Sequence, residues 1–161
     1  MNYRYQMNTP LGELRLFSCR SQLTGLYFEG HTPAPKFEPT NVDSSPFTDI
    51  MDQLEQYFGG ERDIFEVEIE FHGTEFQQQV WEKLRSIPLG QTRSYSELAQ
   101  SIDRPKAVRA VGAAVGRNPI SIIVPCHRVL GSDGSMTGFA GGLVRKKWLL
   151  SRENAVTPLP S

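Results

Sequence analysis

The spacing of hydrophobic residues predicts mixed sheet and helix in the first half of the chain. Alternating segments at residues 3–7 and 13–19 flank a Pro-Leu-Gly turn at 10–12, which is typical of a β-hairpin, and residues 23–29 are predicted as a third strand. Residues 30–46 hold four prolines among Ser, Thr and Asn, which indicates a long loop.

A helix and a further strand are predicted before the middle of the chain. Apolar residues recur at helical spacing from Phe47 to Phe58, between a Ser-Pro start at 45–46 and a Gly-Gly stop at 59–60. Glu then alternates with apolar residues over 66–71, a period-2 pattern that predicts a strand.

The second half is predicted to be mostly helical. Capping boxes at 74–77 and 94–97 each open a helix, and the second helix runs to about Ile102. After a turn at 103–105, residues 106 to about 115 form the next helix. A short helix, a tight turn and a second helix are the layout of a helix-turn-helix.

Composition and length fit a folded protein of one ordinary domain or two small ones. Of 161 residues, 39% are hydrophobic and 22% are charged. The longest apolar run, 120–125, is too short to span a membrane, and the N-terminus lacks the pattern of a secretory signal. Because Cys19 and Cys126 are too few for a disulfide framework, we expect a cytoplasmic protein.

The net charge of −1 conceals an asymmetry between the two halves. Residues 1–72 carry five basic and twelve acidic side chains, a charge of −7, whereas residues 73–161 carry twelve basic and six acidic ones, a charge of +6. The basic half suggests a polyanionic partner such as nucleic acid. The alternative interpretation is that the two halves only expose solvated faces of opposite charge.

The second helix of the helix-turn-helix has an unusual composition. Between Lys106 and Gly116 it holds four alanines, three valines, two glycines and a single arginine, Arg109. Helices that read bases in the major groove usually carry long polar side chains. A helix with such small side chains would allow its backbone to approach DNA closely, with Arg109 as the one long side chain that projects from it. A buried helix packed by small residues explains the same composition equally well.

Candidate chemistry lies at Cys126 and His127, which follow an apolar run closed by Pro125. Cysteine reacts as the thiolate, and a neighbouring base favours its formation. Adjacent side chains of an extended chain point to opposite faces, so a bridging water is expected between the two. On this dipeptide alone, a buried cysteine beside a structural histidine is the commoner arrangement.

The surrounding motifs resemble those of the O6-alkylguanine-DNA alkyltransferases, or methylated-DNA–protein-cysteine methyltransferases. Pro-Cys-His-Arg-Val at 125–129, with Asn118-Pro119 upstream, is similar to their active-site signature. Nearly the whole chain shares the resemblance, through further motifs at 10–12, 76–81, 90–95, 107–112, 138–142 and 148–150 before Glu153. It implies an α/β (α+β) ribonuclease-H-like N-terminal domain, residues 1–72, and a mostly helical C-terminal domain with a helix-turn-helix, residues 73–161.

The resemblance also implies a reaction: DNA repair by irreversible, stoichiometric transfer of an alkyl group from O6-alkylguanine to Cys126, once per molecule. His127 would be the general base, acting through a water, and Glu153 would hold and polarise it. Asn118 would tie the active-site turn together. The Tyr95 hydroxyl would donate toward a ring nitrogen of the leaving guanine, where negative charge develops.

The implied partner is double-stranded DNA bearing O6-alkylguanine; whether O4-alkylthymine is also repaired stays open. The base must leave the stack to be reached, and Arg109 would enter from the minor-groove side and fill the gap. Contacts to phosphate or sugar would come from Tyr95, Ser96, Arg104 and Ser132. Arg104 fits a solvated turn residue equally well. No membrane is involved, and we expect a monomer.

The base pocket would be lined by Val129, Phe139 and Ala140. Phe139 departs from the family, in which a tyrosine is expected. Stacking on the flipped base is retained and a hydroxyl hydrogen bond is lost, which puts the preference among alkyl groups in doubt.

No metal and no cofactor are predicted. Some members of the family bind zinc in the N-terminal domain, but the candidate ligands there are Cys19, His31 and His72, without a close-spaced pair. A structural zinc site needs four ligands. Cys19 is instead expected to be a strand residue that faces the core.

Two other classes of protein compete with this interpretation. A protein that binds damaged DNA without transfer would lack the acceptor cysteine, whereas Cys126 stands here together with His127 and Glu153. A cysteine hydrolase acting on a small molecule would leave the alanine-rich helix and the basic half unexplained.

Overall fold

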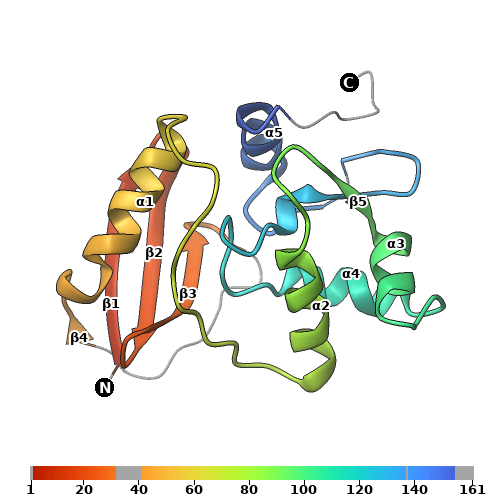
Figure 1. Ribbon diagram of the computed structural model, residues 1–161, viewed down its shortest axis with the longest axis horizontal. Helices are drawn as coiled ribbons and strands as arrows, with labels where there is room; N and C mark the ends of the chain where they lie inside the picture. The colour runs from red at the N-terminus through yellow and green to blue at the C-terminus, as the bar shows by residue number, and fades with distance from the viewer. Residues whose placement is uncertain (1, 32–40, 137, 155–161) are drawn as a thin grey trace.

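Three antiparallel strands and one short parallel strand form the sheet of the first half (Figure 1). β1 (Asn2–Thr9), β2 (Gly12–Cys19) and β3 (Gln22–Phe28) are consecutive neighbours, and β4 (Asn41–Val42) pairs in parallel with β1. The sheet order is therefore β3-β2-β1-β4. The computed structural model describes residues 2–31, 41–136 and 138–154, and residues 32–40 of the predicted loop lie outside this range.

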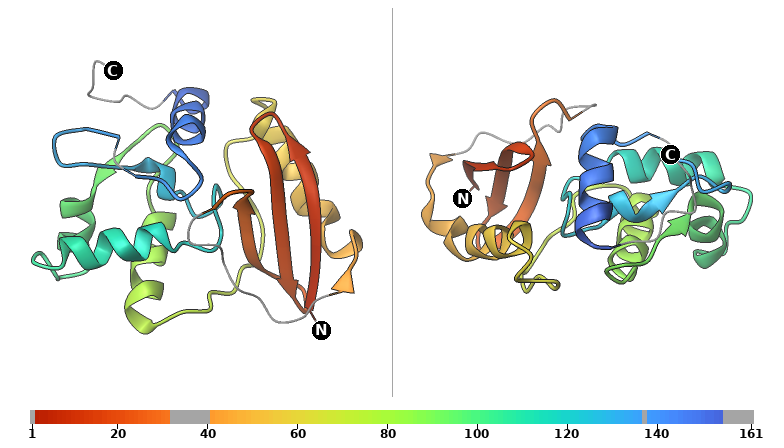
Figure 2. Two further views of the ribbon diagram at one scale, coloured as in Figure 1. Left: turned by 180° about the vertical axis from the view of Figure 1, so that it is seen from behind. Right: turned by 90° about the horizontal axis from the view of Figure 1, so that it is seen from above.

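The helix predicted from the spacing after Phe47 packs on one face of this sheet (Figure 2). A 3-10 turn, η1 (Ser45–Phe47), leads into α1 (Thr48–Phe58). Leu54 of α1 and Leu14 and Leu16 of β2 are fully buried in one hydrophobic core. Each such side chain stabilises the fold by about 1.5–3 kcal/mol, which attaches α1 firmly to the sheet.

The strand predicted over residues 66–71 is wrong. This segment runs extended along β3 but makes a single bridge, in which Leu23 donates to the carbonyl of Glu68 and accepts from the amide of Glu70, both at 2.9 Å. The alternation that suggested a strand arises because Ile69 and its apolar neighbours pack against the core. Packing of one face does not require a ladder of hydrogen bonds.

The prediction that Cys19 faces the core is also wrong. The buried residues of β2 are Leu14, Leu16 and Ser18, which share one face of the strand. Because successive side chains of a strand alternate between faces, Cys19 lies on the opposite face and is half-buried.

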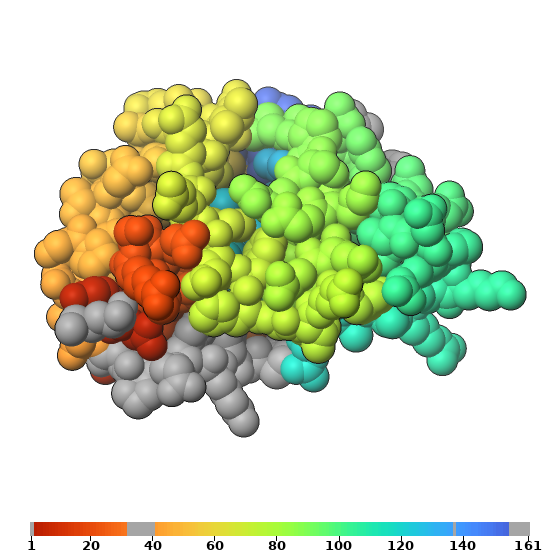
Figure 3. Space-filling view, turned by 60° about the horizontal axis from the view of Figure 1, so that its bottom comes forward, coloured from red at the N-terminus to blue at the C-terminus, as the bar shows by residue number. Residues whose placement is uncertain are grey.

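The second half is helical, as predicted. It contains α2 (Glu75–Arg85), β5 (Arg93–Ser94), α3 (Tyr95–Ser101), α4 (Val108–Gly116), η2 (Cys126–Arg128), β6 (Val129–Leu130) and α5 (Leu143–Arg152). Both predicted capping boxes are present, because Thr74 and Ser94 accept hydrogen bonds from the amides three residues on. The turn between α3 and α4 projects at one end of the molecule (Figure 3).

The two halves are joined at the edge of the sheet. Leu26 of β3 donates to the carbonyl of Pro119 at 2.8 Å and accepts from the amide of Ser121 at 2.7 Å. The segment that leads to Cys126 is therefore docked directly on β3. Among the described residues, no helix is both long and apolar enough to cross a membrane.

Candidate active site

A buried asparagine organises the turn that delivers Cys126. The side-chain amide of Asn118 donates to the carbonyl of Val124 at 2.8 Å, and its oxygen accepts from the amide of Ile120 at 3.0 Å. Within this turn Ile122 has a φ of +73°, which is unfavourable for a β-branched residue. The apolar run at 120–125 therefore folds back on itself instead of forming a strand.

Cys126 begins the 3-10 turn η2 and is 5% exposed. The expectation of an extended chain at Cys126 and His127 is thus wrong, because the backbone turns at this point. Burial raises the pKa of the Cys126 thiol, while a hydrogen bond from Asn118 and the charge of Lys146 act in the opposite direction. A thiol in this setting needs a base to become reactive.

His127 can supply that base, because its two ring nitrogens have different surroundings. Nε2 lies 2.8 Å from Oε2 of Glu153, and Nδ1 is buried without a hydrogen-bonding partner among the described residues. Burial lowers the pKa of His127 in spite of its bond to Glu153, so the ring is neutral at neutral pH. The ionised Glu153 requires the proton on Nε2, which leaves a lone pair on Nδ1.

Glu153 is kept ionised by its neighbours. Burial would raise its pKa, but hydrogen bonds from His127 and Arg128 hold it well below its usual range. Nε of Arg128 donates to Oε1 at 2.8 Å and Nη2 donates to Oε2 at 3.1 Å, while Nη1 donates to the carbonyl of Ile87 at 2.7 Å. Tyr57 of α1 adds a hydrogen bond from its hydroxyl to Oε2 at 2.5 Å.

Sequence reasoning missed Arg128, Tyr57 and Lys146. Arg128 had a signal, because a buried glutamate needs a compensating charge and this arginine follows the Cys-His pair directly. Tyr57 shows only the helical spacing of a core residue. Lys146 is 0% exposed and donates to the carbonyl of Val129 at 2.6 Å. Burial lowers the pKa of Lys146 to about 8, although the negative charge of Cys126 acts to raise it.

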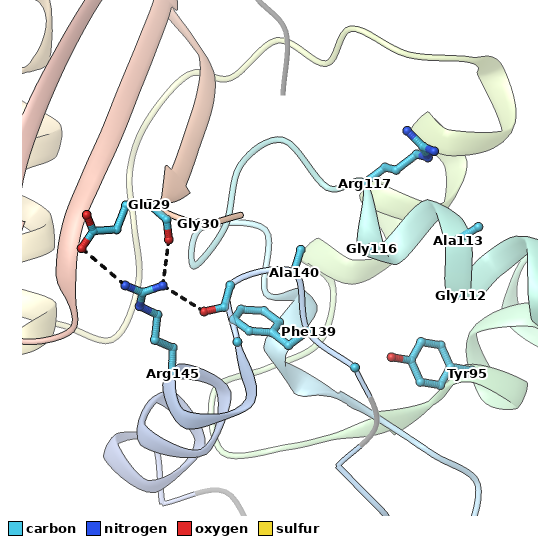
Figure 4. Close-up of a pocket in the computed structure, with 13 residues that line it drawn as sticks. Glu29, Gly30, Tyr95, Gly112, Ala113, Gly116, Arg117, Phe139, Ala140 and Arg145 are labelled. Atoms are coloured by element: carbon cyan, nitrogen blue, oxygen red, sulfur yellow. Dashed lines mark hydrogen bonds and ion pairs between the residues drawn. The ribbon is translucent and has the colours of Figure 1, made fainter. Parts of the chain in front are cut away.

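A cavity of about 810 Å³ opens between α4 and the loop at 138–142 (Figure 4). Tyr95 faces it from α3, with its hydroxyl directed toward the side on which Phe139 and Ala140 lie. The Tyr95 ring packs over Gly112 of α4, where a Cβ would lie 3.8 Å from the ring, at ordinary contact distance. The third predicted pocket residue, Val129, is fully buried.

Arg145 at the start of α5 ties the loop of this cavity to the sheet (Figure 4). Its guanidinium donates to the carbonyls of Leu11, Glu29 and Gly141 at 2.8, 2.9 and 3.1 Å. It also lies 4.8 Å from the centre of the Phe28 ring. One side chain therefore connects two turns of the first half with the wall of the cavity.

The buried-helix interpretation of the composition of α4 is correct for one face of the helix, and the close approach to DNA stays a prediction for the other. Val111, Ala114 and Val115 are buried, and the indole of Trp81 donates to the carbonyl of Ala114 at 2.8 Å. The opposite face is exposed and carries the remaining small residues together with charged ones: Arg109, Ala110, Ala113 and Arg117.

Ser96, Ser132 and Arg104, the other predicted DNA contacts, lie on α3, in the loop after β6 and in the α3–α4 turn. The hydroxyls of Ser96 and Ser132 are 3.1 Å apart, so α3 and the loop after β6 meet there. Arg104 is exposed in the α3–α4 turn, 5.7 Å from the centre of the Phe76 ring. Among the described residues, no three His, Cys, Asp or Glu side chains are grouped as a metal site would require.

Comparison with known proteins identifies relatives for both halves. Profiles described as 6-O-methylguanine DNA methyltransferase, ribonuclease-like domain and DNA binding domain, match residues 2–71 and 75–155. A methylated-DNA–protein-cysteine methyltransferase of Mycobacterium bovis is 46% identical over 158 residues, 98% of this chain and 95% of that protein. One from Methanosarcina mazei is 53% identical over 152 residues, covering 94% and 96%.

A solved structure extends the similarity to three dimensions. The crystal structure of Mycobacterium tuberculosis OGT in complex with DNA matches with a TM-score of 0.90 at 45% identity, covering 94% of this chain and 92% of that one. These matches confirm the predicted fold class, a ribonuclease-like α/β part followed by a helical part with a helix-turn-helix.

Proposed function

The chain belongs to the family of methylated-DNA–protein-cysteine methyltransferases, enzymes of DNA repair, and we propose that it moves the alkyl group of O6-alkylguanine in DNA onto Cys126. The observation that carries this proposal is the hydrogen bond from His127 to Glu153, which leaves Nδ1 of the histidine available as a base beside the cysteine motif. A protein that only binds damaged DNA would lack the acceptor cysteine, whereas Cys126 is present here next to His127.

In the proposed reaction the sulfur of Cys126 attacks the alkyl carbon, and the new sulfur–carbon bond forms as the carbon–O6 bond breaks. The thiol proton passes through a water to Nδ1 of His127, and Glu153 stabilises the resulting imidazolium. Lys146 favours the thiolate by its charge. A thioether has no easy route back to a thiol, so each molecule reacts once.

O6 of the guanine keeps the electron pair of the broken carbon–O6 bond. The Tyr95 hydroxyl donates toward a ring nitrogen of the base as negative charge develops there. The proton that the thiol lost reaches the repaired guanine, which stays in the DNA, through solvent, and this balances the reaction. Phe139 stacks on the flipped base and, with Ala140 and Val129, delimits its pocket.

Double-stranded DNA is the proposed substrate, a choice supported by the DNA complex of the similar Mycobacterium tuberculosis structure. The exposed small residues of α4 allow its backbone to approach the minor groove, and Arg109 fills the space of the flipped nucleotide. Tyr95, Ser96, Arg104 and Ser132 bind the sugar-phosphate backbone.

Three further points stay predictions: a domain boundary between residues 72 and 73, a monomeric state, and a cytoplasmic location. Sedimentation of the protein alone and with a short duplex tests the second of these. A mass of one chain is expected for the free protein.

A titration of methyl transfer tests the proposed function. Increasing amounts of protein are incubated with a duplex that contains one O6-methylguanine, and repaired DNA is counted. One lesion repaired per protein molecule, with no further turnover, is expected. Repair of many lesions per molecule, or of none, would overturn the proposal.

A further inference from the structure

Tyr57 lies in the first half of the chain, yet its hydroxyl reaches the carboxylate that holds His127. It donates to Oε2 of Glu153 at 2.5 Å, across 96 positions of sequence, and the side chain is fully buried. We propose that Tyr57 is a positioning residue for alkyl transfer, which holds Oε2 of Glu153 against Nε2 of His127. This inference rests on the proposed function.

The ring of Tyr57 is fixed by groups from both halves. The guanidinium of Arg152 lies 4.4 Å from the ring centre, and its Nε donates to the backbone carbonyl of Tyr57 at 2.6 Å. Phe65 contacts the ring from the segment after α1, with 5.3 Å between ring centres. Two consecutive residues at the end of α5, Arg152 and Glu153, therefore bind one tyrosine, which sets the place of its hydroxyl.

The geometry of Glu153 indicates what the hydroxyl does. Arg128 binds Oε1 at 2.8 Å but Oε2 only at 3.1 Å, whereas Oε2 is close to Tyr57 and to His127, at 2.5 and 2.8 Å. Oε2 therefore lies further from the guanidinium of Arg128 than Oε1 does, and it lies closer to the other two donors, Tyr57 and His127. Charged pairs of this kind favour distances of about 2.7–2.9 Å, so without the hydroxyl Oε2 would move toward Arg128 and away from His127.

Tyr57 can serve as a donor throughout the working range of pH. Burial and the nearby charge of Glu153 both raise the pKa of the hydroxyl, so the proton stays on the tyrosine. The hydroxyl therefore orients the Glu153 carboxylate in the same way at every pH in this range. No proton needs to move along the hydrogen bond between Tyr57 and Glu153.

Tyr57→Phe tests the inference because it keeps the ring contacts and removes only the hydroxyl. With duplex DNA containing O6-methylguanine, the single-turnover rate constant should fall about tenfold while the half-saturating DNA concentration stays within about twofold. The rise of rate with pH should shift to higher pH, because a less well held His127 is a weaker base. Tyr27→Phe, which removes a hydroxyl from another buried tyrosine of the same half, should leave both properties unchanged.

A spectroscopic measurement gives a readout that does not depend on transfer. In protein labelled with ¹⁵N-histidine, the proton on Nε2 of His127 should resonate further upfield in Tyr57→Phe and exchange faster with water. A purely structural role would lower the melting temperature and move neither the pH profile nor this resonance.

The outcomes separate the two proposals. A parent protein that transfers no methyl group would overturn the proposed function and this inference with it. A parent that transfers, with Tyr57→Phe equal to it in rate, pH profile and resonance, would overturn the role of Tyr57 alone.

Discussion

Nε2 of His127 lies 2.8 Å from Oε2 of Glu153, and neither side chain is exposed to solvent. The glutamate is ionised, so it takes the hydrogen bond from Nε2 and leaves Nδ1 as the basic atom. A neutral imidazole held in one tautomer can accept a proton from a buried thiol, which cannot easily lose it to water.

Glu153→Gln should slow transfer at neutral pH by about tenfold or more. Without the carboxylate the imidazolium form of His127 is less stable, so the apparent pKa of Cys126 rises and the rate increases only at higher pH. His127→Gln should shift the profile in the same direction. Single-turnover rates measured against pH check this, with the exposed Glu82→Gln as the control. Unchanged profiles in both variants would remove the pair from the mechanism.

Lys146→Met should change the pH dependence of stability. Burial lowers the pKa of Lys146 from 10.5 to about 8, so between these values the unfolded chain binds more protons than the folded one. The parent therefore gains stability as the pH rises through this range, by up to roughly 3 kcal/mol, and the variant does not.

Denaturant unfolding of both proteins from pH 7 to pH 10 measures this difference. The stability of Lys146→Met relative to the parent should be highest near pH 7 and fall above pH 8. Its transfer rate at neutral pH should be lower, because a positive charge near the thiolate is lost. A stability difference that is constant over this range would contradict the prediction.

Arg145→Gln should loosen the loop at 138–142. The variant loses hydrogen bonds to the carbonyls of Leu11, Glu29 and Gly141, and a stability loss of about 1–3 kcal/mol is expected. Amide hydrogen exchange in the loop should become faster and transfer slower, because the wall of the base pocket is less well held. Lys147→Gln alters an exposed residue of the same helix and should change neither.

Much of the fold could be predicted because local patterns determine it. The capping boxes at Thr74 and Ser94 depend on residues three positions apart, and α1 follows from the spacing of its apolar residues. The segment at 66–71 was predicted wrongly because alternation reports which face is buried and says nothing about whether a neighbouring strand is free to pair.

Residues of the site could be predicted from the sequence only where they belong to a recognisable motif. Cys126 and His127 are adjacent in sequence, and Glu153 entered through the resemblance to the family. Tyr57 shows only the helical spacing of a core residue and Lys146 belongs to no motif. Their roles arise from contacts of α1 with the end of α5 and of α5 with β6, which no local pattern encodes.

Arg109→Ala distinguishes two roles for the exposed face of α4. If Arg109 fills the stack, transfer in duplex DNA should slow far more than in a short single strand, where there is little stacking to replace. Arg109→Lys should rescue poorly, because a planar guanidinium stacks on bases and an ammonium does not. The ratio of single-turnover rates on the two substrates measures this. Equal loss on both would indicate a phosphate contact instead.

Peptide mass spectrometry after incubation with duplex DNA containing O6-methylguanine identifies the residue that accepts the methyl group. The peptide that bears Cys126 should gain one methylene mass, in the parent and in Cys19→Ala. Cys126→Ala should gain no mass and should still bind DNA, because binding rests on α4 and the basic side chains. A methyl group found on any other residue, or removal of methyl groups by Cys126→Ala, would exclude Cys126 as the acceptor.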